Sequence, residues 1–168
     1  ARSDMFDLEE ELDVQGPSRR FSFQKVKHSA NREGYASVAI PGTTAGLCAA
    51  LERWGTISLD QAIRPAAEFA RSGFPIPRTV ALTLVGGYSL LKRFEATRQI
   101  YLNGDAPLRV GQRFIQSDYA ETLERIASTG VDEFYRGETA ARICDDLERH
   151  GGYLRAEDLA QYRPILHD

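Results

Sequence analysis

The segment Gly34–Trp54 constrains the fold more than any other part of this chain, because it predicts a strand, a tight turn and a helix in succession. Its first part, Tyr35–Ile40, interleaves alanine, valine and isoleucine with small residues, which is typical of a short strand buried on both faces. Such a strand needs partners, and the best internal candidate is the weakly alternating Phe21–Val26. We therefore expect part of the sheet to be formed by residues outside this chain.

The second part of the segment predicts a helix that begins after Pro41-Gly42. Thr43 and Thr44 can cap its first turn. Its larger apolar side chains recur with the spacing i, i+4 and i+7, which places them on one helical face, as in helices that pack on a core. These side chains are Leu47, Leu51 and Trp54.

Short helices account for most of the remaining chain. Ser58 and Gln61 have the spacing of a capping box, and the helix that they start should run to about Ser72 with a kink at Pro65. Residues 80–94 are apolar around most of a helical circumference, as expected of a buried helix. A further helix is expected from Ser117 or Asp118 to Gly130, followed by one short turn at Asp132–Gly137. Two more helices are expected at Glu138–His150 and Arg155–Tyr162.

Two of these helices have a clear apolar face. The side chains expected to point inward are Ala62, Ile63, Ala66, Phe69 and Ala70 in the helix after Ser58, and Ala141, Ile143, Cys144 and Leu147 in the helix after Gly137. Six or seven short helices and two or three strand-like pieces show neither strand–helix alternation nor a repeat of fixed period. The predicted fold class is therefore mainly α, with one or two strands.

The first 33 residues differ from the rest. Asp7–Asp13 is acidic with few apolar residues, which is typical of a solvated, mobile segment. After Gly16-Pro17, apolar and polar residues alternate through Phe21–Val26, which favours an edge strand. We expect residues 1–168 to be one domain fragment, with an irregular N-terminal segment at 1–33 and a strand plus helical layer at 34–168.

Charge and hydropathy exclude several kinds of partner. The 21 basic and 24 acidic residues are spread along the chain and give a net charge of −3, so no basic surface for nucleic acid is expected. The longest apolar run, Val80–Leu91, is interrupted by polar residues and glycines and is shorter than the roughly 20 residues of a membrane span. These features favour neither a secreted nor a cytoplasmic location.

Candidates for catalysis are few. His28 lies in a polar loop, His150 in the last turn of a helix and His167 at the end of the chain, and no sequence pattern pairs them with a nucleophile. Cys48 and Cys144 have no neighbouring metal ligands and lie within helical patterns, where a thiol behaves as a small core side chain. We therefore predict no catalytic, cofactor-binding or metal-binding residue in this chain, and no cofactor.

Two further features have both a structural and a functional interpretation. Backbone amides at the turn Pro41–Gly46 could hold an anion, but the simpler interpretation is that Gly42 permits the turn and Gly46 permits close helix packing. Adjacent carboxylates on a helix point about 100° apart and do not converge as a general acid and base, so we interpret them as caps and solvated faces. These pairs are Asp132-Glu133, Asp145-Asp146 and Glu157-Asp158.

Five blocks of the sequence resemble the γ-glutamyltranspeptidase family in the same order. Ile40–Leu47, followed by Ala50–Thr56, is similar to the family's Val-Pro-Gly-x-x-Ala-Gly…Leu…Tyr-Gly-Thr signature. The other similar blocks are Ala1–Phe6, Pro65–Pro75, Leu123–Gly137 and Gly151–Tyr162. The resemblance thus extends from Ala1 to about Pro164, and five blocks in one order are hard to obtain by chance.

This resemblance implies the layered αββα fold of an N-terminal nucleophile hydrolase, made as a precursor that cuts itself into a large and a small subunit. In that family the new N-terminal threonine of the small subunit attacks a γ-glutamyl amide, with its own α-amine as the base. Backbone amides stabilise the oxyanion, and the acyl group then passes to water or to an amino acid. Amidases that act on other small acids share this architecture.

The chain is similar to the middle of the large subunit, so the resemblance implies that the catalytic groups lie outside it. The family's Arg-Glu-x-Ala-Pro motif, whose arginine holds the substrate carboxylate, would lie just before Ala1, and the nucleophilic threonine well beyond Asp168. Because Ala1 is not preceded by an initiator methionine, we also expect a processed or trimmed chain.

The partners implied by the resemblance are a companion small subunit, or the remainder of the same precursor, and a small γ-glutamyl or related amide substrate. Two alternatives belong to other classes of protein. The chain could be a free-standing helical interaction module without enzymatic origin, or an anion-binding domain that uses the Gly42 turn.

Overall fold

The computed structural model describes residues 5–13 and 23–166 of the chain, and most of them are helical, as the sequence predicts. The α-helices are α1 (Thr43–Trp54), α2 (Leu59–Ser72), α3 (Arg78–Gly86), α4 (Tyr88–Leu91), α5 (Glu95–Tyr101), α6 (Ser117–Thr129), α7 (Asp132–Arg136), α8 (Glu138–Arg149) and α9 (Ala156–Gln161). Two 3₁₀ turns, η1 (Lys27–Ser29) and η2 (Tyr35–Ser37), precede them.

The strands are short and form three separate antiparallel pairs. β1 (Leu8–Asp13) pairs with β2 (Phe23–Val26), β3 (Phe74–Pro75) with β6 (Arg113–Phe114), and β4 (Leu102–Asn103) with β5 (Ala106–Pro107). The first pair has an irregular register between Leu8 and Leu12. Among the described residues no sheet has more than two strands, so the helices carry most of the packing.

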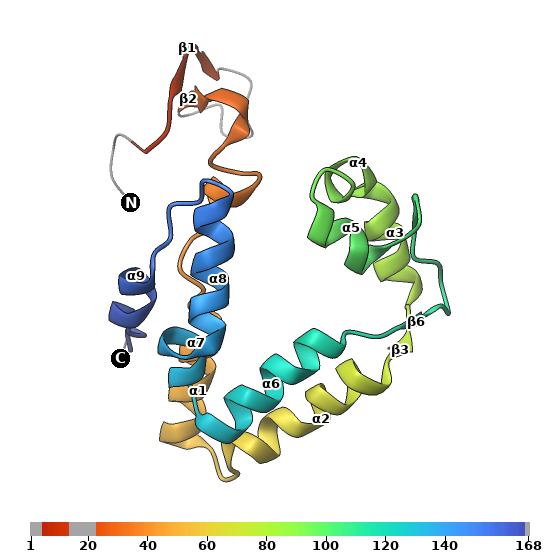
Figure 1. Cartoon of the computed structure of the whole chain (residues 1–168), viewed down its shortest axis with the longest axis vertical. Helices are drawn as coiled ribbons and strands as arrows, with labels where there is room; N and C mark the ends of the chain where they lie inside the picture. Colours follow the sequence, from red (N-terminus) through yellow and green to blue (C-terminus); the bar gives the residue numbers. More distant parts are fainter. Residues whose placement is uncertain (1–4, 14–22, 167–168) are drawn as a thin grey trace.

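The elements follow a U-shaped course (Figure 1). α1, α7 and α8 form one limb, the antiparallel helices α2 and α6 form the base, and α3, α4 and α5 form the other limb. The two limbs touch through an ion pair between Glu33 and Arg93 and an edge-to-face contact between Tyr35 and Phe94, whose ring centroids are 6.0 Å apart. α9 lies on the outer side of α8 (Figure 1).

Local contacts explain where the two helices at the base of the U begin and end. At the start of α2 the Ser58 hydroxyl accepts a hydrogen bond from the N–H of Gln61 (3.2 Å), and the Gln61 side chain accepts one from the N–H of Ser58 (2.9 Å). This is the capping box that the sequence predicts. α2 continues through Pro65, and Arg71 at its end makes two hydrogen bonds to Glu124 of α6. α6 ends where Gly130 adopts a φ of +94°.

Two separate apolar cores stabilise the two limbs. The first core joins α1 to α7, α8 and α9 through Ala45, Tyr135, Ala140, Cys144, Leu147, Leu154 and Leu159. The second core joins α3 to the strands around it through Ile76, Ala81, Leu84, Leu108 and Phe114. Each core is small, so the chain buries fewer of its apolar side chains than its sequence pattern suggests.

The expected strand at Tyr35–Ile40 is not formed. Tyr35–Ser37 is the 3₁₀ turn η2, and residues 38–42 have no regular secondary structure, although Val38 has an extended backbone. A strand exists only through hydrogen bonds to a neighbouring strand, and none lies beside this segment among the described residues. Within the acidic segment Asp7–Asp13, for which the sequence predicts no strand, Leu8–Asp13 forms β1 against β2.

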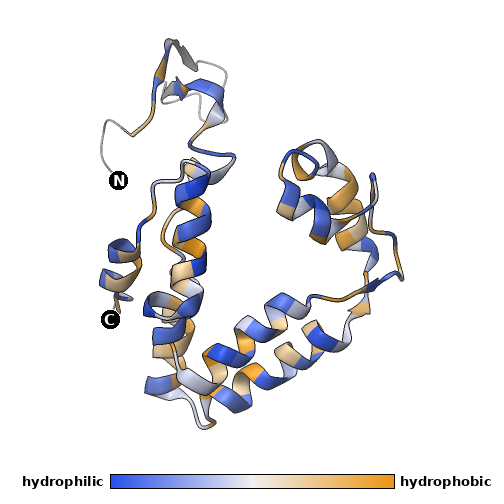
Figure 2. Ribbon diagram, viewed as in Figure 1, coloured by the Kyte–Doolittle hydropathy of each residue, from blue (hydrophilic) through white to orange (hydrophobic). Residues whose placement is uncertain are grey.

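The residues expected to form one buried helix at 80–94 instead form parts of two helices. α3 ends at Gly86 and α4 begins at Tyr88, because two successive glycines weaken the helix between them. Only Ala81 and Leu84 of α3 are buried, whereas Leu82 and Val85 are 61% and 62% exposed. Figure 2 shows α3 as one of the most apolar helices of the molecule.

The apolar face of α1 is exposed rather than buried. Leu47 and Trp54 are 67% and 66% exposed, and the buried residue of this helix is Ala45. In α2 the buried residues are Ala67 and Ala70, while Phe69 is 64% exposed and Ala62 and Ala66 are exposed as well. In α8, Ala141 is exposed and Thr139, Ala140, Cys144 and Leu147 are buried. These helices thus keep apolar faces that no described part of the chain covers.

Candidate functional site

The first turn of α1 is the place where distant segments of the chain meet through polar contacts. The hydroxyl of Tyr135, on α7, donates a hydrogen bond to the carbonyl oxygen of Pro41 (2.5 Å) and accepts one from the N–H of Ala45 (3.1 Å). Burial raises the pKa of this hydroxyl, which keeps the proton that it donates to Pro41. We call this pair of hydrogen bonds the Tyr135 bridge.

The Tyr135 bridge replaces the cap that the sequence suggests. Gly42 is the N-cap residue of α1, and neither Thr43 nor Thr44 caps the helix with its side chain. The first N–H groups of a helix lack partners within the helix, and the Tyr135 hydroxyl supplies one from another element. An anion at this turn would therefore find the Ala45 amide already occupied by the protein itself.

Tyr162, which follows α9, covers the same turn from a second direction. Its ring stacks on that of Tyr135, with centroids 5.7 Å apart and planes 12° from parallel. A Cβ atom at Gly42 would lie 2.3 Å from the Tyr162 hydroxyl oxygen. The φ of Gly42 is −88°, which any residue can adopt, so a larger residue here would disturb the contact with Tyr162 and not the turn conformation. A Cβ at Gly46 would meet no described atom within 4 Å, so the expected packing role of Gly46 is not observed.

A buried carboxylate lies two residues before Tyr135. One oxygen of Glu133 accepts hydrogen bonds from the Thr139 N–H (3.1 Å), the Thr139 hydroxyl (3.0 Å) and Arg125 Nε (3.2 Å). Burial raises the pKa of Glu133, but these hydrogen bonds outweigh burial and hold the pKa below its usual range. Glu133 thus joins α6, α7 and α8 and fixes the helix that carries Tyr135.

The adjacent carboxylates are mostly caps and solvated groups, as predicted. Asp158 accepts a hydrogen bond from the N–H of Arg155 (2.9 Å) at the start of α9. Asp132 is exposed and pairs with Arg136, and Asp145 and Asp146 are exposed on α8. Glu133 is the exception, because it is 7% exposed. No spacing rule distinguishes it in the sequence, since its partner Arg125 is brought close by the turn at Gly130.

Neither of the two described histidines meets a nucleophile. The ring of His150 stacks on Tyr35, with centroids 4.3 Å apart, and its Nδ1 lies 2.8 Å from the carbonyl oxygen of Asp146. His28 is exposed in η1. His167 lies outside the described residues. The two described histidines therefore have the structural positions that the sequence predicts for them.

The two cysteines are free thiols. Cys144 is buried in the first core, and Cys48 is half-buried on α1. Burial raises the pKa of both thiols, which disfavours the reactive thiolate. Both therefore act as small apolar side chains, in agreement with the interpretation from the sequence.

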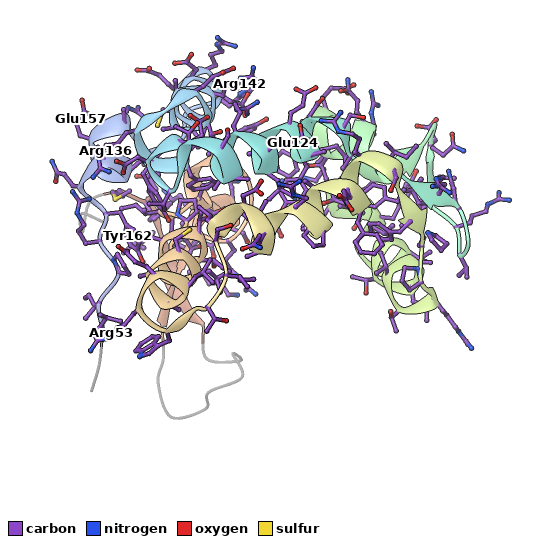
Figure 3. All side chains as sticks on the ribbon, turned by 90° about the horizontal axis from the view of Figure 1, so that it is seen from below. Arg53, Glu124, Arg136, Arg142, Glu157 and Tyr162 are labelled. Atoms are coloured by element: carbon purple, nitrogen blue, oxygen red, sulfur yellow. The ribbon has the colours of Figure 1, made fainter. Side chains whose placement is uncertain are left out.

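Two open cavities lie on the described part of the chain. One, of about 270 Å³, is lined by Cys48, Leu51, Glu52, Ile57, Leu59 and Val131. The other, of about 310 Å³, lies where the limbs touch and is lined by Gly34, Tyr35, Val38, Phe94, Ala96, Thr97 and Asp146. The first cavity contains one thiol, Cys48, and one carboxylate, Glu52, but burial raises the pKa of that thiol and disfavours the thiolate. Figure 3 shows that the labelled charged side chains Arg53, Glu124, Arg142 and Glu157 come from four different helices.

Across residues 5–13 and 23–166, no three histidine, cysteine, aspartate or glutamate side chains gather in a way that could hold a metal ion. In the same part of the chain, every helix is too short or too polar to cross a lipid bilayer.

The Tyr135 bridge and the stacking of Tyr162 on Tyr135 together join three of the blocks that resemble the same family in sequence. Pro41 and Ala45 belong to the block Ile40–Leu47, Tyr135 to Leu123–Gly137, and Tyr162 to Gly151–Tyr162. Most residues of the first core come from these blocks as well. The blocks therefore describe one packed unit, although about 90 residues separate the first from the second.

Comparisons with known proteins agree with this pattern. A family model described as Gamma-glutamyltranspeptidase matches residues 16–168. A glutathione hydrolase proenzyme from Bacillus subtilis is 36% identical over 162 residues, covering 96% of this chain and 25% of that protein. An acylase ACY 1 proenzyme from Pseudomonas sp. strain SE83 is 35% identical, covering 82% of this chain and 25% of that protein.

Solved structures show the same relationship. The γ-glutamyltranspeptidase of Helicobacter pylori superposes with a TM-score of 0.80 at 33% identity and covers 83% of this chain and 40% of that chain. The cephalosporin acylase of Bacillus halodurans superposes with a TM-score of 0.74 at 30% identity and covers 79% of this chain and 26% of that chain. The chain spans about a quarter of the length of the curated relatives it matches.

Proposed function

Because this chain belongs to the γ-glutamyltranspeptidase family, we propose that it is a scaffolding part of the large subunit of such an enzyme. In this proposal residues 1–168 are one domain fragment, which supplies the helical outer layer. The rest of the precursor, including the small subunit, supplies the reactive groups. The polypeptide alone is then inactive.

The observation that carries this proposal is that the polar groups at the junction of the family-like blocks are paired with one another. The Tyr135 hydroxyl is hydrogen-bonded to the Pro41 carbonyl and the Ala45 amide, and the Glu133 carboxylate is hydrogen-bonded to Thr139 and Arg125. Groups that are hydrogen-bonded inside the fold in this way stabilise it, and these hydrogen bonds compete with binding of substrate or movement of protons. Their role in the enzyme is therefore to hold shape.

Exposed apolar residues support the same proposal. Leu47 and Trp54 on α1, Phe69 on α2, and Leu82 and Val85 on α3 are each more than 60% exposed. Exposed apolar side chains in such number indicate contact with another protein surface. Since the curated relatives are about four times as long as the matched region, the remainder of the precursor is the natural partner.

The proposed chemistry is cleavage or transfer of a γ-glutamyl amide or of a related small-acid amide. The nucleophile is an N-terminal threonine outside this chain, which attacks the amide carbon while its own α-amine accepts the proton. Backbone amides of the enzyme stabilise the oxyanion, and the acyl group then passes to water or to an amino acid. The names glutathione hydrolase and acylase among the relatives support this substrate class.

The test compares the full-length protein with this polypeptide alone, using a γ-glutamyl anilide that releases a coloured amine. We expect turnover by the full-length protein after it has cleaved itself, and none above background by residues 1–168. Turnover by the isolated polypeptide would contradict the proposal. An inactive full-length protein, together with a polypeptide that unfolds cooperatively as a monomer, would favour a helical interaction module instead.

A further inference from the structure

The hairpin formed by β4 and β5 presents an asparagine–glycine pair to solvent. Asn103 is the last residue of β4 and pairs with Ala106, so Gly104 and Asp105 form the two-residue turn between the strands. Asn103, Gly104 and Asp105 are all exposed. Gly104 has a φ of +63°, which glycine adopts without strain.

The two groups that can react with each other are both free. Among the described residues, neither the side-chain amide of Asn103 nor the backbone N–H of Gly104 has a hydrogen-bond partner. A Cβ atom built at Gly104 would meet no described atom within 4 Å, so the space around this peptide bond is open. Because glycine has no side chain, its backbone nitrogen can approach the side chain of the preceding residue without obstruction.

We propose that Asn103 is a site of spontaneous deamidation. The backbone nitrogen of Gly104 loses its proton to solvent base and attacks the side-chain amide carbon of Asn103. A new C–N bond closes a five-membered succinimide ring, and the amide C–N bond breaks and releases ammonia. One water molecule then opens the ring at either carbonyl, which leaves aspartate or isoaspartate at position 103.

The surrounding structure gives this site its local freedom. A hairpin of two-residue strands is only marginally stable, so brief opening lets the Asn103 side chain reach the conformation that ring closure needs. Asn31, the other asparagine of the chain, lacks these features. It is exposed, but it precedes an arginine, and the N–H of Arg32 donates a hydrogen bond to the carbonyl oxygen of Ser29 (2.8 Å).

Deamidation would change the second core. Isoaspartate adds one carbon atom to the main chain, so Leu102 and Pro107 can no longer keep their register. Leu102 is buried, and Leu108 belongs to the second core. The aspartate product instead places a second negative charge beside Asp105. Either product loosens the limb formed by α3, α4 and α5 and leaves the first core unchanged.

The experiment uses the full-length protein, folded and incubated in mildly alkaline buffer made with heavy-oxygen water. The protein is then digested quickly in ordinary water, and the peptides are separated and weighed. We expect the peptide that contains Asn103 to convert into two acidic forms, aspartate and isoaspartate, each carrying the heavy oxygen. The peptide that contains Asn31 should keep its amide over the same period.

Two variants complete the test. Asn103→Gln keeps an amide at the turn but requires a six-membered ring for the same attack, so the conversion should be lost. Asn31→Gln should leave conversion at Asn103 unchanged. Conversion at Asn103 no faster than at Asn31 would overturn the proposal. Products without the heavy oxygen would also overturn it, since the reaction would then have occurred during digestion and not in the folded protein.

Discussion

The hydroxyl of Tyr135 is a single group on which the geometry of a whole turn depends. It is buried and bonded at both ends, to the Pro41 carbonyl and the Ala45 amide. A sequence gives no sign of this, because a tyrosine in a short helix is equally suited to a surface position. The structural reason for a tyrosine here is that two unpaired backbone groups of another segment lie within reach of one hydroxyl.

Tyr135→Phe should lower the free energy of unfolding of the chain by about 1–3 kcal/mol, because it leaves the buried Ala45 amide and the half-buried Pro41 carbonyl without this partner. Urea denaturation followed by circular dichroism measures this change. Tyr119→Phe is the control, since Tyr119 is 53% exposed. That variant should stay within about 0.5 kcal/mol of the parent chain. Equal effects of the two substitutions would contradict the Tyr135 bridge.

Gly42→Ala should destabilise the chain by about 1–3 kcal/mol, the usual cost of forcing an extra carbon into a packed site, because the new Cβ would collide with the Tyr162 hydroxyl. Combining it with Tyr162→Phe, which removes the colliding oxygen, should recover part of that loss in a double-mutant cycle. Gly46→Ala, in open space on the same helix, should stabilise the chain by about 0.5–1 kcal/mol. Strict additivity of the first two changes would refute the steric explanation.

At the scale of elements, Glu133 joins three helices through one carboxylate oxygen. Its pKa is lowered in the folded state, so its contribution to stability is complete above the ordinary glutamate pKa. The contribution is lost as the pH falls below the ordinary glutamate pKa and through the lowered value. The stability of the contact between α6, α7 and α8 should therefore fall in acid, when Glu133 is protonated.

Glu133→Gln should cost about 3 kcal/mol at neutral pH, because it leaves Arg125 partly buried without its counter-charge. It should also flatten the fall in stability below about pH 4. Denaturation curves at a series of pH values test both expectations. Glu124→Gln is the matched control on α6, since that carboxylate and its partner Arg71 are each 49% exposed. An unchanged acid transition in the Glu133 variant would show that another group controls it.

The capping box of α2 gives a second prediction for an element. Ser58→Ala should cost about 1 kcal/mol, because the N–H of Gln61 loses its acceptor at the helix start. Ser58→Gly should cost only a few tenths of a kcal/mol, as glycine tolerates the N-cap position and lets water reach the amides. Thermal unfolding measures the difference. Similar losses in both variants would mean that Ser58 acts through something other than capping.

At the scale of the whole molecule, the exposed apolar faces determine how the isolated chain behaves. We expect residues 1–168 to self-associate as concentration rises, since Leu47, Trp54 and Phe69 face solvent. Leu47→Lys should reduce this association, whereas Thr56→Lys, which adds the same charge at an exposed polar position, should change it much less. Sedimentation velocity over a range of concentrations tests this, and a monomer at every concentration would refute it.

Much of the local structure was predictable from the sequence. The helices α1, α2 and α6 are confirmed, because the capping box at Ser58, the glycines that end helices and the helical spacing are local signals that act over one or two turns. The apolar faces were predicted less well. Leu47 and Phe69 have the right helical spacing for burial, but whether a face is covered depends on elements distant in the sequence or outside the described residues.

The sequence by itself determined the helical class, most helix boundaries and membership of a family, since each depends on the order of residues along the chain. Only the tertiary structure decided that Tyr135 and Tyr162 close the turn at Gly42, that Glu133 is buried, and that residues 35–40 form no strand. The physical reason is distance along the chain. Tyr135 and Tyr162 are far from Gly42 in the sequence, and Glu133 meets Arg125, eight residues before it, only because the chain turns at Gly130. A strand forms only where another strand is present to share its hydrogen bonds.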